Sequence, residues 1–271
     1  MAKQGEEYDL LLSGGVDIIN ITPGHYPGRF LLCDAYNLPY FIPYFGEEEA
    51  TTGKKLRETL YEEFFIPHHF SDVKTLWTGR FEPNVLHSAS KPVRTIEDIK
   101  GMTVSIPGGN ILANFVKGLG GSPEFVAMTD VYTSLERGVV DATILPLETQ
   151  LSFKFYEVTK AITKYGYGAV TNSQAMNLGL WNSLPPDIQN VFNELSAWAT
   201  VVQTQVSQGS TQAAIGVAKK NGLEIIDLSP EELGRWKKVA EPLEMGWVAD
   251  VDSKGLPGTE LYNRIQELIS K

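Results

Sequence analysis

The stretch with the clearest capacity to bind a ligand is the Pro-Gly-Gly-Asn corner at residues 107–110, which lies between MTVSI and ILANFVKGL. Glycine lets a ligand approach the backbone closely, and the free N–H groups at a helix start attract negatively charged groups. Asn110 is expected to cap the helix that follows. The pattern predicts a ligand cradle with contacts at Gly108 and Asn110, and a plain strand-to-helix turn is the alternative.

Sequence patterns that are typical of enzymes are missing. The chain has no His-Glu-x-x-His, Cys-x-x-Cys, Gly-x-Ser-x-Gly or Gly-x-x-x-x-Gly-Lys-Ser/Thr. His68 and His69 are adjacent, which points their side chains apart and argues against a shared metal ion. The single cysteine, Cys33, excludes an internal disulfide bond and is expected to be a buried packing residue. The sequence therefore predicts neither a metal site nor a cofactor.

Composition limits the classes of partner. A chain of 271 residues with 42% hydrophobic residues can bury a substantial core. Its formal net charge of −10 argues against nucleic acid and anionic lipid, because both require a basic surface. No segment has the roughly 20 apolar residues of a membrane span. The first fifteen residues also lack the basic start and apolar run of a signal peptide.

Short β-rich runs alternate with helical patterns along the chain. The runs predicted as strands are residues 16–22, 73–79, 85–89, 102–106, 123–128, 140–145 and 223–228. Thr129 and Ser229 are expected to cap helices, and Ser229 is followed by the proline and glutamate of a capping box. Such alternation favours an α/β fold with largely parallel sheets.

One helical pattern is too long for a single compact domain. Residues 186–220 contain no proline after their start, so they predict a helix of roughly 50 Å at ~1.5 Å per residue. A helix of this length should bridge two lobes. The alternative is a pair of helices broken at Gln208-Gly209-Ser210, because glycine weakens a helix.

Several blocks of the sequence closely resemble the DctP-type solute-binding receptors of TRAP transporters. The blocks are SKPVRTIEDIKGMTVSIPGG, GGSPEFVAMTDVYTSLERGVVDATILP, KFYEVTKAITKY, MNLGLWNSLPPDIQNVF and WKKVAEPLEMGWVADVDSKGLPG. LLLSGGVDIINIT and NLPYFI extend the resemblance to nearly the whole chain. The resemblance implies a periplasmic receptor and not an enzyme. It would capture a small organic acid in a cleft between two α/β lobes and deliver it to TRAP membrane subunits.

The same resemblance implies a two-lobe periplasmic-binding-protein-like α/β fold with a long inter-lobe helix. Lobe I would hold residues 1–79 plus 172–210, and lobe II residues 80–171 plus 211–271. The helix at about 186–220 would flex as the cleft closes. Receptors of this type have a secretion signal, a first strand and a first helix before a stretch such as KQGEEYDLLLSGG. We therefore expect the chain as given to lack one strand of lobe I and part of the pocket.

Two positions depart from the pattern of the resembling receptors. An arginine that pairs with the ligand carboxylate is replaced by Ser105, and an asparagine is replaced by Leu145, whose neighbour Ile144 stands where a glutamate is frequent. Either the ligand is more apolar, aromatic or neutral, or another donor holds its acid group. The candidate donors are Arg80, His25, His87 and the backbone N–H groups of residues 108–110. We favour an apolar or aromatic carboxylic acid with a displaced cation.

The remaining candidates lie near the expected cleft. Trp77 and Phe81 flank Arg80 where the chain crosses between lobes, so an aromatic face can stack on the ligand there. Family position places Thr22 and His25 at the wall of lobe I and Met128 at the wall of lobe II. Three candidates also have a structural interpretation, which is core packing for Trp77 and Met128 and a satisfied buried histidine for His87.

Other functions of the same architecture remain alternatives. A ligand-sensing module of a regulator would need a basic DNA-binding segment, and none is present. A cleft enzyme would need a nucleophile or an acid/base pair. Ser105, Ile144, Leu145 and Met128 provide no such pair. The sequence makes no prediction of the oligomeric state.

Overall fold

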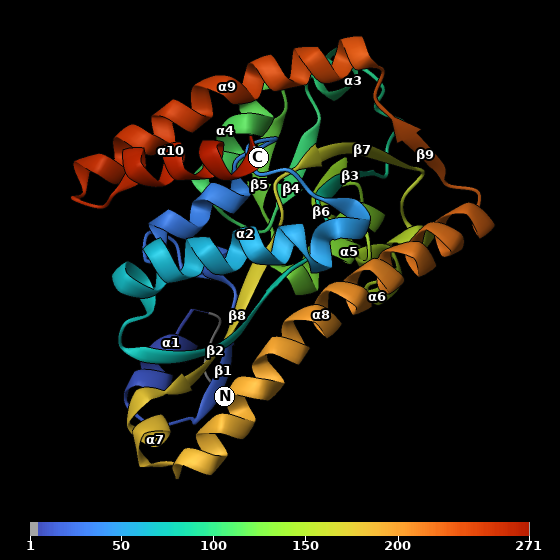
Figure 1. Ribbon diagram of the computed structural model, residues 1–271. Coiled ribbons are helices and arrows are strands. Elements are labelled where there is room, and N and C mark those ends of the chain that lie inside the picture. Colours follow the sequence, from blue (N-terminus) through green and yellow to red (C-terminus); the bar gives the residue numbers. More distant parts are fainter. Residues whose placement is uncertain (1–4, 271) are drawn as a thin grey trace.

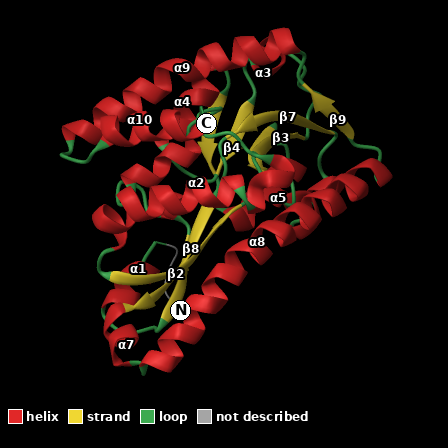
Figure 2. Cartoon of the chain, in the orientation of Figure 1, coloured by secondary structure: helices red, strands yellow, loops and turns green. Residues whose placement is uncertain are grey.

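The computed structural model describes residues 5–270, apart from the side chains of residues 165 and 167 (Figure 1). Its strands form two sheets (Figure 2). The smaller sheet, in lobe I, has the order β1 (Ile18–Ile21), β8 (Thr171–Asn177) and β2 (Val73–Arg80). The larger sheet, in lobe II, has the order β5 (Ser122–Phe125), β4 (Thr103–Ile106), β6 (Ala142–Pro146), β3 (Asn84–Ser88), β7 (Ala161–Tyr167) and β9 (Glu224–Asp227). The predicted two-lobe α/β fold is confirmed.

Helices surround both sheets. They are α1 (Glu7–Leu12), α2 (Thr52–Leu60), α3 (Ile96–Ile99), α4 (Asn110–Gly118), α5 (Val131–Glu136), α6 (Thr149–Ser152), α7 (Leu178–Ser183), α8 (Pro186–Lys220), α9 (Pro230–Ser253) and α10 (Gly258–Ile269). A π-helical stretch, η4 (Tyr61–Phe70), continues α2. The 3-10 turns are η1 (Pro23–His25), η2 (Leu31–Asn37), η3 (Gly46–Ala50), η5 (Met128–Asp130) and η6 (Phe155–Glu157).

The seven predicted strands are present, but β7 and β8 were not predicted. The prediction of largely parallel sheets is wrong. The smaller sheet is antiparallel, because β8 runs antiparallel to both β1 and β2, and the larger sheet is mixed, because β3 runs antiparallel to β6 and β7 whereas its other pairs are parallel. The cap by Ser229 is confirmed, since its side chain accepts the N–H of Glu232 at 3.2 Å. The cap by Thr129 is wrong, because Asp130 precedes α5 and a 3-10 turn occupies residues 128–130.

Helix α8 runs unbroken for 35 residues, so the predicted long helix is confirmed and the two-helix alternative is wrong. It contacts β2 in the smaller sheet and β9 and α6 in lobe II (Figure 1). Its buried face carries small hydroxyl residues that let the helix approach closely. Thr204, for example, donates to the carbonyl of Thr200 at 3.2 Å. Proline in the first turn and lysines in the last favour the helix at its ends.

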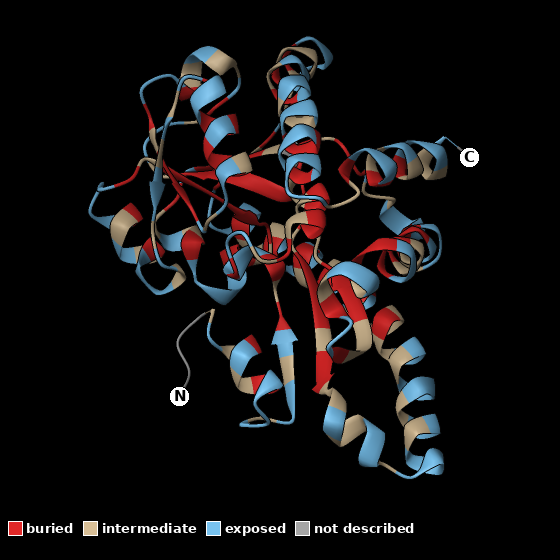
Figure 3. Cartoon of the chain, turned by 90° about the vertical axis from the view of Figure 1, so that its left-hand side faces the viewer, coloured by how far each residue is buried: buried red, intermediate tan, exposed pale blue. Residues whose placement is uncertain are grey.

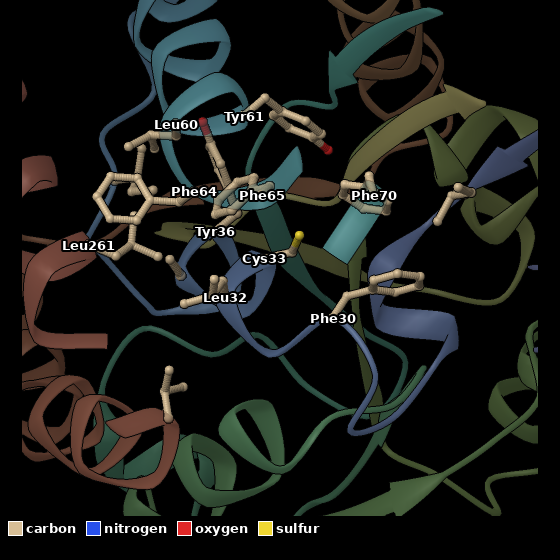
Figure 4. Packing of buried hydrophobic residues seen from close by; sticks show 14 of the residues in the cluster. Phe30, Leu32, Cys33, Tyr36, Leu60, Tyr61, Phe64, Phe65, Phe70 and Leu261 are labelled. Atoms are coloured by element: carbon tan, nitrogen blue, oxygen red, sulfur yellow. The ribbon is translucent and has the colours of Figure 1, made fainter. Parts of the chain in front are cut away.

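Two hydrophobic clusters form the main cores of the lobes. The first contains Phe30 and Phe70, whose rings stack with centroids 4.9 Å apart (Figure 4). Cys33 lies in this cluster with its thiol buried, which confirms its predicted packing role. The second cluster lies between the larger sheet and helices α4 and α9, and it includes Leu86 and Trp236. Buried residues accordingly gather in the inner strands of the sheets and where the lobes meet, whereas the edge strands β1 and β5 are largely exposed (Figure 3).

Helix α9 joins the two clusters. Trp236 packs in the second cluster, whereas Trp247 and Val251 pack in the first. The indole N–H of Trp247 donates to the carbonyl of Leu31 at 3.0 Å. Helix α10 also packs in the first cluster, although it lies within residues 211–271. The C-terminal end of the chain therefore contacts the lobe that contains the smaller sheet.

Replacing Gly209 by alanine is expected to stabilise the protein. A Cβ at this position meets no atom within 4 Å, and alanine favours a helix interior by roughly 1 kcal/mol over glycine. Melting followed by circular dichroism should shift upward by about 2–4 °C. Gly138→Ala is the matched control, because its φ of +68° strains any residue with a Cβ and should lower the melting temperature. A lower melting temperature for Gly209→Ala would contradict the unbroken helix.

Candidate functional site

The Pro-Gly-Gly corner of lobe II faces a turn of lobe I. Gly109 occupies the N-cap position of α4 with φ +88°, so the predicted cap by Asn110 is wrong and Asn110 is the first helical residue. A Cβ at Gly108 would lie 3.5 Å from the carbonyl oxygen of Gly24. Gly24 belongs to η1, which follows Thr22. The structure thus brings the corner at residues 107–110 to the turn that holds Thr22 and His25.

Arg80 lies at the point where the chain crosses between the lobes. It ends β2, and the N–H of the next residue, Phe81, donates to Val170 O of the returning segment at 2.9 Å. Arg80 is only 2% exposed, and its two Nη atoms donate to the carbonyls of Pro43 and Ile42 at 2.7 and 3.0 Å. Its guanidinium group therefore fixes the loop before η3 to the crossing.

A buried carboxylate links Arg80 to a second arginine. Glu49 and Arg57 are both fully buried, and Arg57 Nη1 donates to Glu49 Oε1 at 3.1 Å. Arg80 Nη1 lies 3.7 Å from Glu49 Oε2, and Arg57 Nε donates to the hydroxyl of Thr78 at 3.3 Å. Burial lowers the pKa of Arg80, and the negative charge of Glu49 opposes this shift. Two guanidinium groups therefore share one carboxylate in the interior.

Gly53 makes the approach of Glu49 to Arg57 possible. Glu49, Gly53 and Arg57 follow each other at intervals of four residues. A Cβ at Gly53 would lie 2.5 Å from the carboxyl group of Glu49. The repeated interval was the signal in the sequence for this contact.

His87 is buried inside lobe II. Gln150 Nε2 donates to His87 Nδ1 at 2.7 Å, and His87 Nε2 lies 3.2 Å from the carbonyl oxygen of Leu145. Burial lowers the pKa of His87 to about 4, so the imidazole is neutral near pH 7. The ring joins β3, β6 and α6 and carries no charge that a ligand could use.

Ser105 and Leu145 also lie in the interior of lobe II, and Met128 is half-buried beside them. Ser105 is fully buried, pairs in register with Thr143, and its hydroxyl has no hydrogen-bond partner among the described residues. Leu145 packs in a small cluster with Val131, and Met128 packs against the same cluster. The larger sheet therefore offers a neutral interior behind the corner at its edge.

Trp77 lines a different space. A cavity of about 260 Å³ lies between β2, η4 and α8, and Trp77, Tyr61 and Thr200 are among its lining residues. Arg80 does not line this cavity. Phe81 is half-buried at the crossing. The structure therefore places Phe81 beside Arg80 and places Trp77 against α8.

Comparison with known proteins identifies the family. The sequence model of the bacterial extracellular solute-binding protein family 7, DctP, matches residues 1–246. The chain belongs to this family. It is 27% identical over 247 residues to the C4-dicarboxylate-binding periplasmic protein DctP of Rhodobacter capsulatus. The matched region covers 89% of this chain and 72% of that protein. It is 24% identical to the sialic acid-binding periplasmic protein SiaP of Vibrio cholerae, over 84% of this chain and 72% of that protein.

Solved structures of TRAP solute-binding proteins have the same fold as this family 7 protein. A protein from Rhodoferax ferrireducens T118, solved with copurified benzoate, is 25% identical with a TM-score of 0.89. A marine metagenome protein specific for aromatic acid ligands, solved with 3-hydroxybenzoate, is 26% identical with the same TM-score. Each comparison covers all of this chain and 84% of the other chain.

The described part of this family 7 chain contains neither a helix suited to cross a membrane nor a cluster suited to hold a metal. Among residues 5–270, no helix is both long and apolar enough to span a bilayer. No group of three or more histidine, cysteine or acidic side chains gathers at a possible metal position in the same residues. His68 and His69 do not share a partner, since His68 contacts the carbonyl of Phe64 and His69 accepts the N–H of Leu32.

Two carboxyl groups beside the crossing were not predicted as part of the site. Tyr44 donates to Glu82 Oε1 at 3.2 Å, and the hydroxyl of Thr211 in α8 donates to Glu148 Oε2 at 3.4 Å. Burial raises the pKa of Glu148 to about 7, and the charge of Glu82 adds to the shift. Burial also raises the pKa of Glu82. No pattern in the sequence indicates that Glu82 and Glu148 lie close together, because the two residues are far apart along the chain.

Glu148→Gln is expected to stabilise the protein above neutral pH. The pKa of the Glu148 carboxyl is higher in the folded state than in the unfolded state. The free energy of unfolding therefore falls as the pH rises from about 4.5 to 7. The variant avoids this loss, so its melting temperature should exceed that of the wild type by several degrees at pH 8 and match it near pH 4.5. Melting temperatures measured between pH 4.5 and 8.5 check the prediction.

Glu224→Gln serves as the control with the opposite sign. The side-chain hydrogen bond from Arg94 lowers the pKa of Glu224, so its charged form stabilises the folded state at neutral pH. This variant should melt slightly lower than the wild type at pH 8, because the ion pair is exposed. Equal profiles for Glu148→Gln and the wild type would refute the raised pKa.

Proposed function

We propose that this family 7 protein is an extracytoplasmic receptor for a small aromatic or apolar carboxylic acid. It captures the acid between its two lobes and delivers it to the membrane subunits of a TRAP transporter from the periplasm. The observation that carries the proposal is Arg80, a buried cation at the crossing between the lobes. It supplies the charge that Ser105 cannot provide.

A ligand with a carboxylate group needs a positively charged partner when that group is buried. An unpaired carboxylate in a site without water is strongly disfavoured, and a serine hydroxyl can donate a hydrogen bond but cannot neutralise the charge. Arg80 is a planar cation that suits a carboxylate. Its position at the crossing supports its role as the displaced cation.

The apolar part of the ligand follows from the surroundings of Arg80. Its guanidinium carbon lies 5.4 Å from the ring centre of Tyr36 and 5.6 Å from that of Tyr44, and Phe81 follows it in the chain. Two solved relatives, named above, bind aromatic acids. The proposed ligand contacts are Thr22, His25, Trp77, Arg80, Phe81, His87, Ser105, Gly108, Asn110, Met128 and Leu145.

The proposal also includes the division of the chain into two lobes and a role in binding without catalysis. Residues 1–79 plus 172–210 form lobe I, and residues 80–171 plus 211–271 form lobe II, with the C-terminal helices also contacting lobe I. The protein binds its ligand without converting it, because the proposed contacts contain no nucleophile paired with a base. Membership of a solute-binding family supports this interpretation.

Aromatic acids should stabilise the protein, and their neutral analogues should not. We expect benzoate and 3-hydroxybenzoate, at about 100 times the dissociation constant, to add roughly 2.7 kcal/mol to the free energy of unfolding. Benzamide and 3-hydroxybenzyl alcohol should add little. Isothermal titration and thermal melting measure both effects.

Arg80→Gln tests which cation holds the acid. Loss of a charged hydrogen bond weakens binding by about 1.5–3 kcal/mol, so the affinity for benzoate should fall at least about tenfold. Arg94→Gln removes an arginine from an exposed ion pair in lobe II and should leave the affinity unchanged. Binding of benzamide as tight as that of benzoate would contradict the proposed ligand class. Chemical conversion of the bound acid would contradict a receptor.

A further inference from the structure

The buried cluster at the crossing has one positive charge too many. Arg57 and Arg80 are the two cations, and Glu49 is the one acidic side chain within residues 5–270 that forms an ion pair with either of them. All three side chains are at most 2% exposed. A buried charge without a partner costs several kcal/mol. A second anion is therefore needed to balance the cluster.

Three hydrogen-bond donors of the cluster are also unused. Arg57 Nη2, Arg80 Nε and Tyr36 Oη are shielded from solvent, and none has an acceptor in the described part of the chain. Arg80 lies against the ring of Tyr36, and both arginines act electrostatically on the Tyr36 hydroxyl. Buried polar groups are normally hydrogen-bonded. One carboxylate has two oxygens that accept several hydrogen bonds, and it carries the missing negative charge.

We infer that Arg57, Arg80 and Tyr36 form a socket for one carboxylate group, with Glu49 as the permanent counter-ion beside it. This inference rests on the proposed function in so far as the carboxylate belongs to the captured acid. A free small carboxylate such as formate has the same chemistry and fits the same donors.

The socket lies beside the two chain segments that cross between the lobes. Arg80 ends β2 at the crossing, and the carbonyl of Tyr36 accepts the N–H of Ala169 at 2.9 Å in the segment that returns from β7 to β8. A Cβ at Gly168 would lie 2.5 Å from the same carbonyl. The backbone is thus tightly packed where the lobes join.

A purely structural cluster makes the opposite prediction for Tyr36. If no ligand uses the hydroxyl, Tyr36→Phe only removes a buried polar atom that lacks a partner, and this change is neutral or stabilising. If the hydroxyl donates to a carboxylate, the same change weakens the binding of that carboxylate. The two cases therefore differ in the affinity of Tyr36→Phe for a carboxylate, which can be measured separately from the stability of the fold.

The decisive experiment measures formate and benzoate binding to the wild type, Tyr36→Phe and Tyr40→Phe. Tyr40 is the matched control, because its hydroxyl is also buried without a partner among the described residues, but its ring lies against Phe115 and not against the arginines. Isothermal titration and thermal melting should show a loss of about 5- to 10-fold for both acids in Tyr36→Phe. Tyr40→Phe should bind as the wild type does.

Arg57→Lys is the second variant. It keeps the positive charge but loses the planar fork of donors, so it should weaken carboxylate binding about tenfold or more. The Tyr36 comparison remains decisive if this variant does not fold. Sodium chloride at the same ionic strength as sodium formate is the control for general salt effects on the melting temperature. A rise in melting temperature with chloride equal to that with formate would overturn the inference.

The outcomes distinguish the socket from the proposed function. Unchanged benzoate affinity in Tyr36→Phe overturns the socket and leaves the receptor function standing. Formate binding that depends on Tyr36 and Arg57, without any aromatic acid binding, supports the socket and contradicts the proposed ligand class. Absence of formate and benzoate binding in the wild type overturns the socket.

Discussion

The arrangement of the two lobes depends on one buried carboxylate. Glu49 lies within 3.1 Å of Arg57 and 3.7 Å of Arg80, and Arg80 ends the strand that leads from one lobe into the other. Arg80 also donates to the backbone carbonyls of Ile42 and Pro43 in the loop before η3. Removing Glu49 would leave two like charges buried together, which costs far more than an exposed ion pair contributes. The conformation of the crossing is therefore tied to the charge balance of this cluster.

Three separate elements restrict how the lobes move. The strand crossing is the first, helix α8 contacts the smaller sheet and lobe II, and helix α9 packs in both core clusters. The crossing carries backbone hydrogen bonds between its two segments, whereas α8 contacts its neighbours through small hydroxyl residues such as Thr200 and Thr204. Shallow contacts of this kind allow sliding with little loss of packing. For the proposed closure of the lobes, a hinge at the crossing with α8 and α9 adjusting along their length is compatible with these contacts.

The sequence predicted the elements with strong local patterns and missed those that depend on distant partners. Helix α8 was predictable because proline and glycine signals are absent from most of its length. Strand β8 was not, since TNSQAMN has little apolar alternation, yet Thr171, Asn172 and Ser173 are buried and pair with β2. Among the proposed contacts, Arg80 was found from its place between lobes. Arg57 was missed, because its burial depends on a carboxylate eight residues earlier and on the turn from η3 into α2 that brings the two side chains together.

The proposed ligand site has unlike walls in the two lobes. In lobe II, His87 is held neutral by burial and its ring nitrogens bond within the lobe, so this wall offers no charge to an acid. At the crossing and in lobe I, the arginine cluster retains a net positive charge beside aromatic rings. An acid in the proposed site therefore gains its charge pairing from the crossing and lobe I alone. Closure of lobe II then adds apolar contact and excludes water, which strengthens the pairing without requiring a second cation.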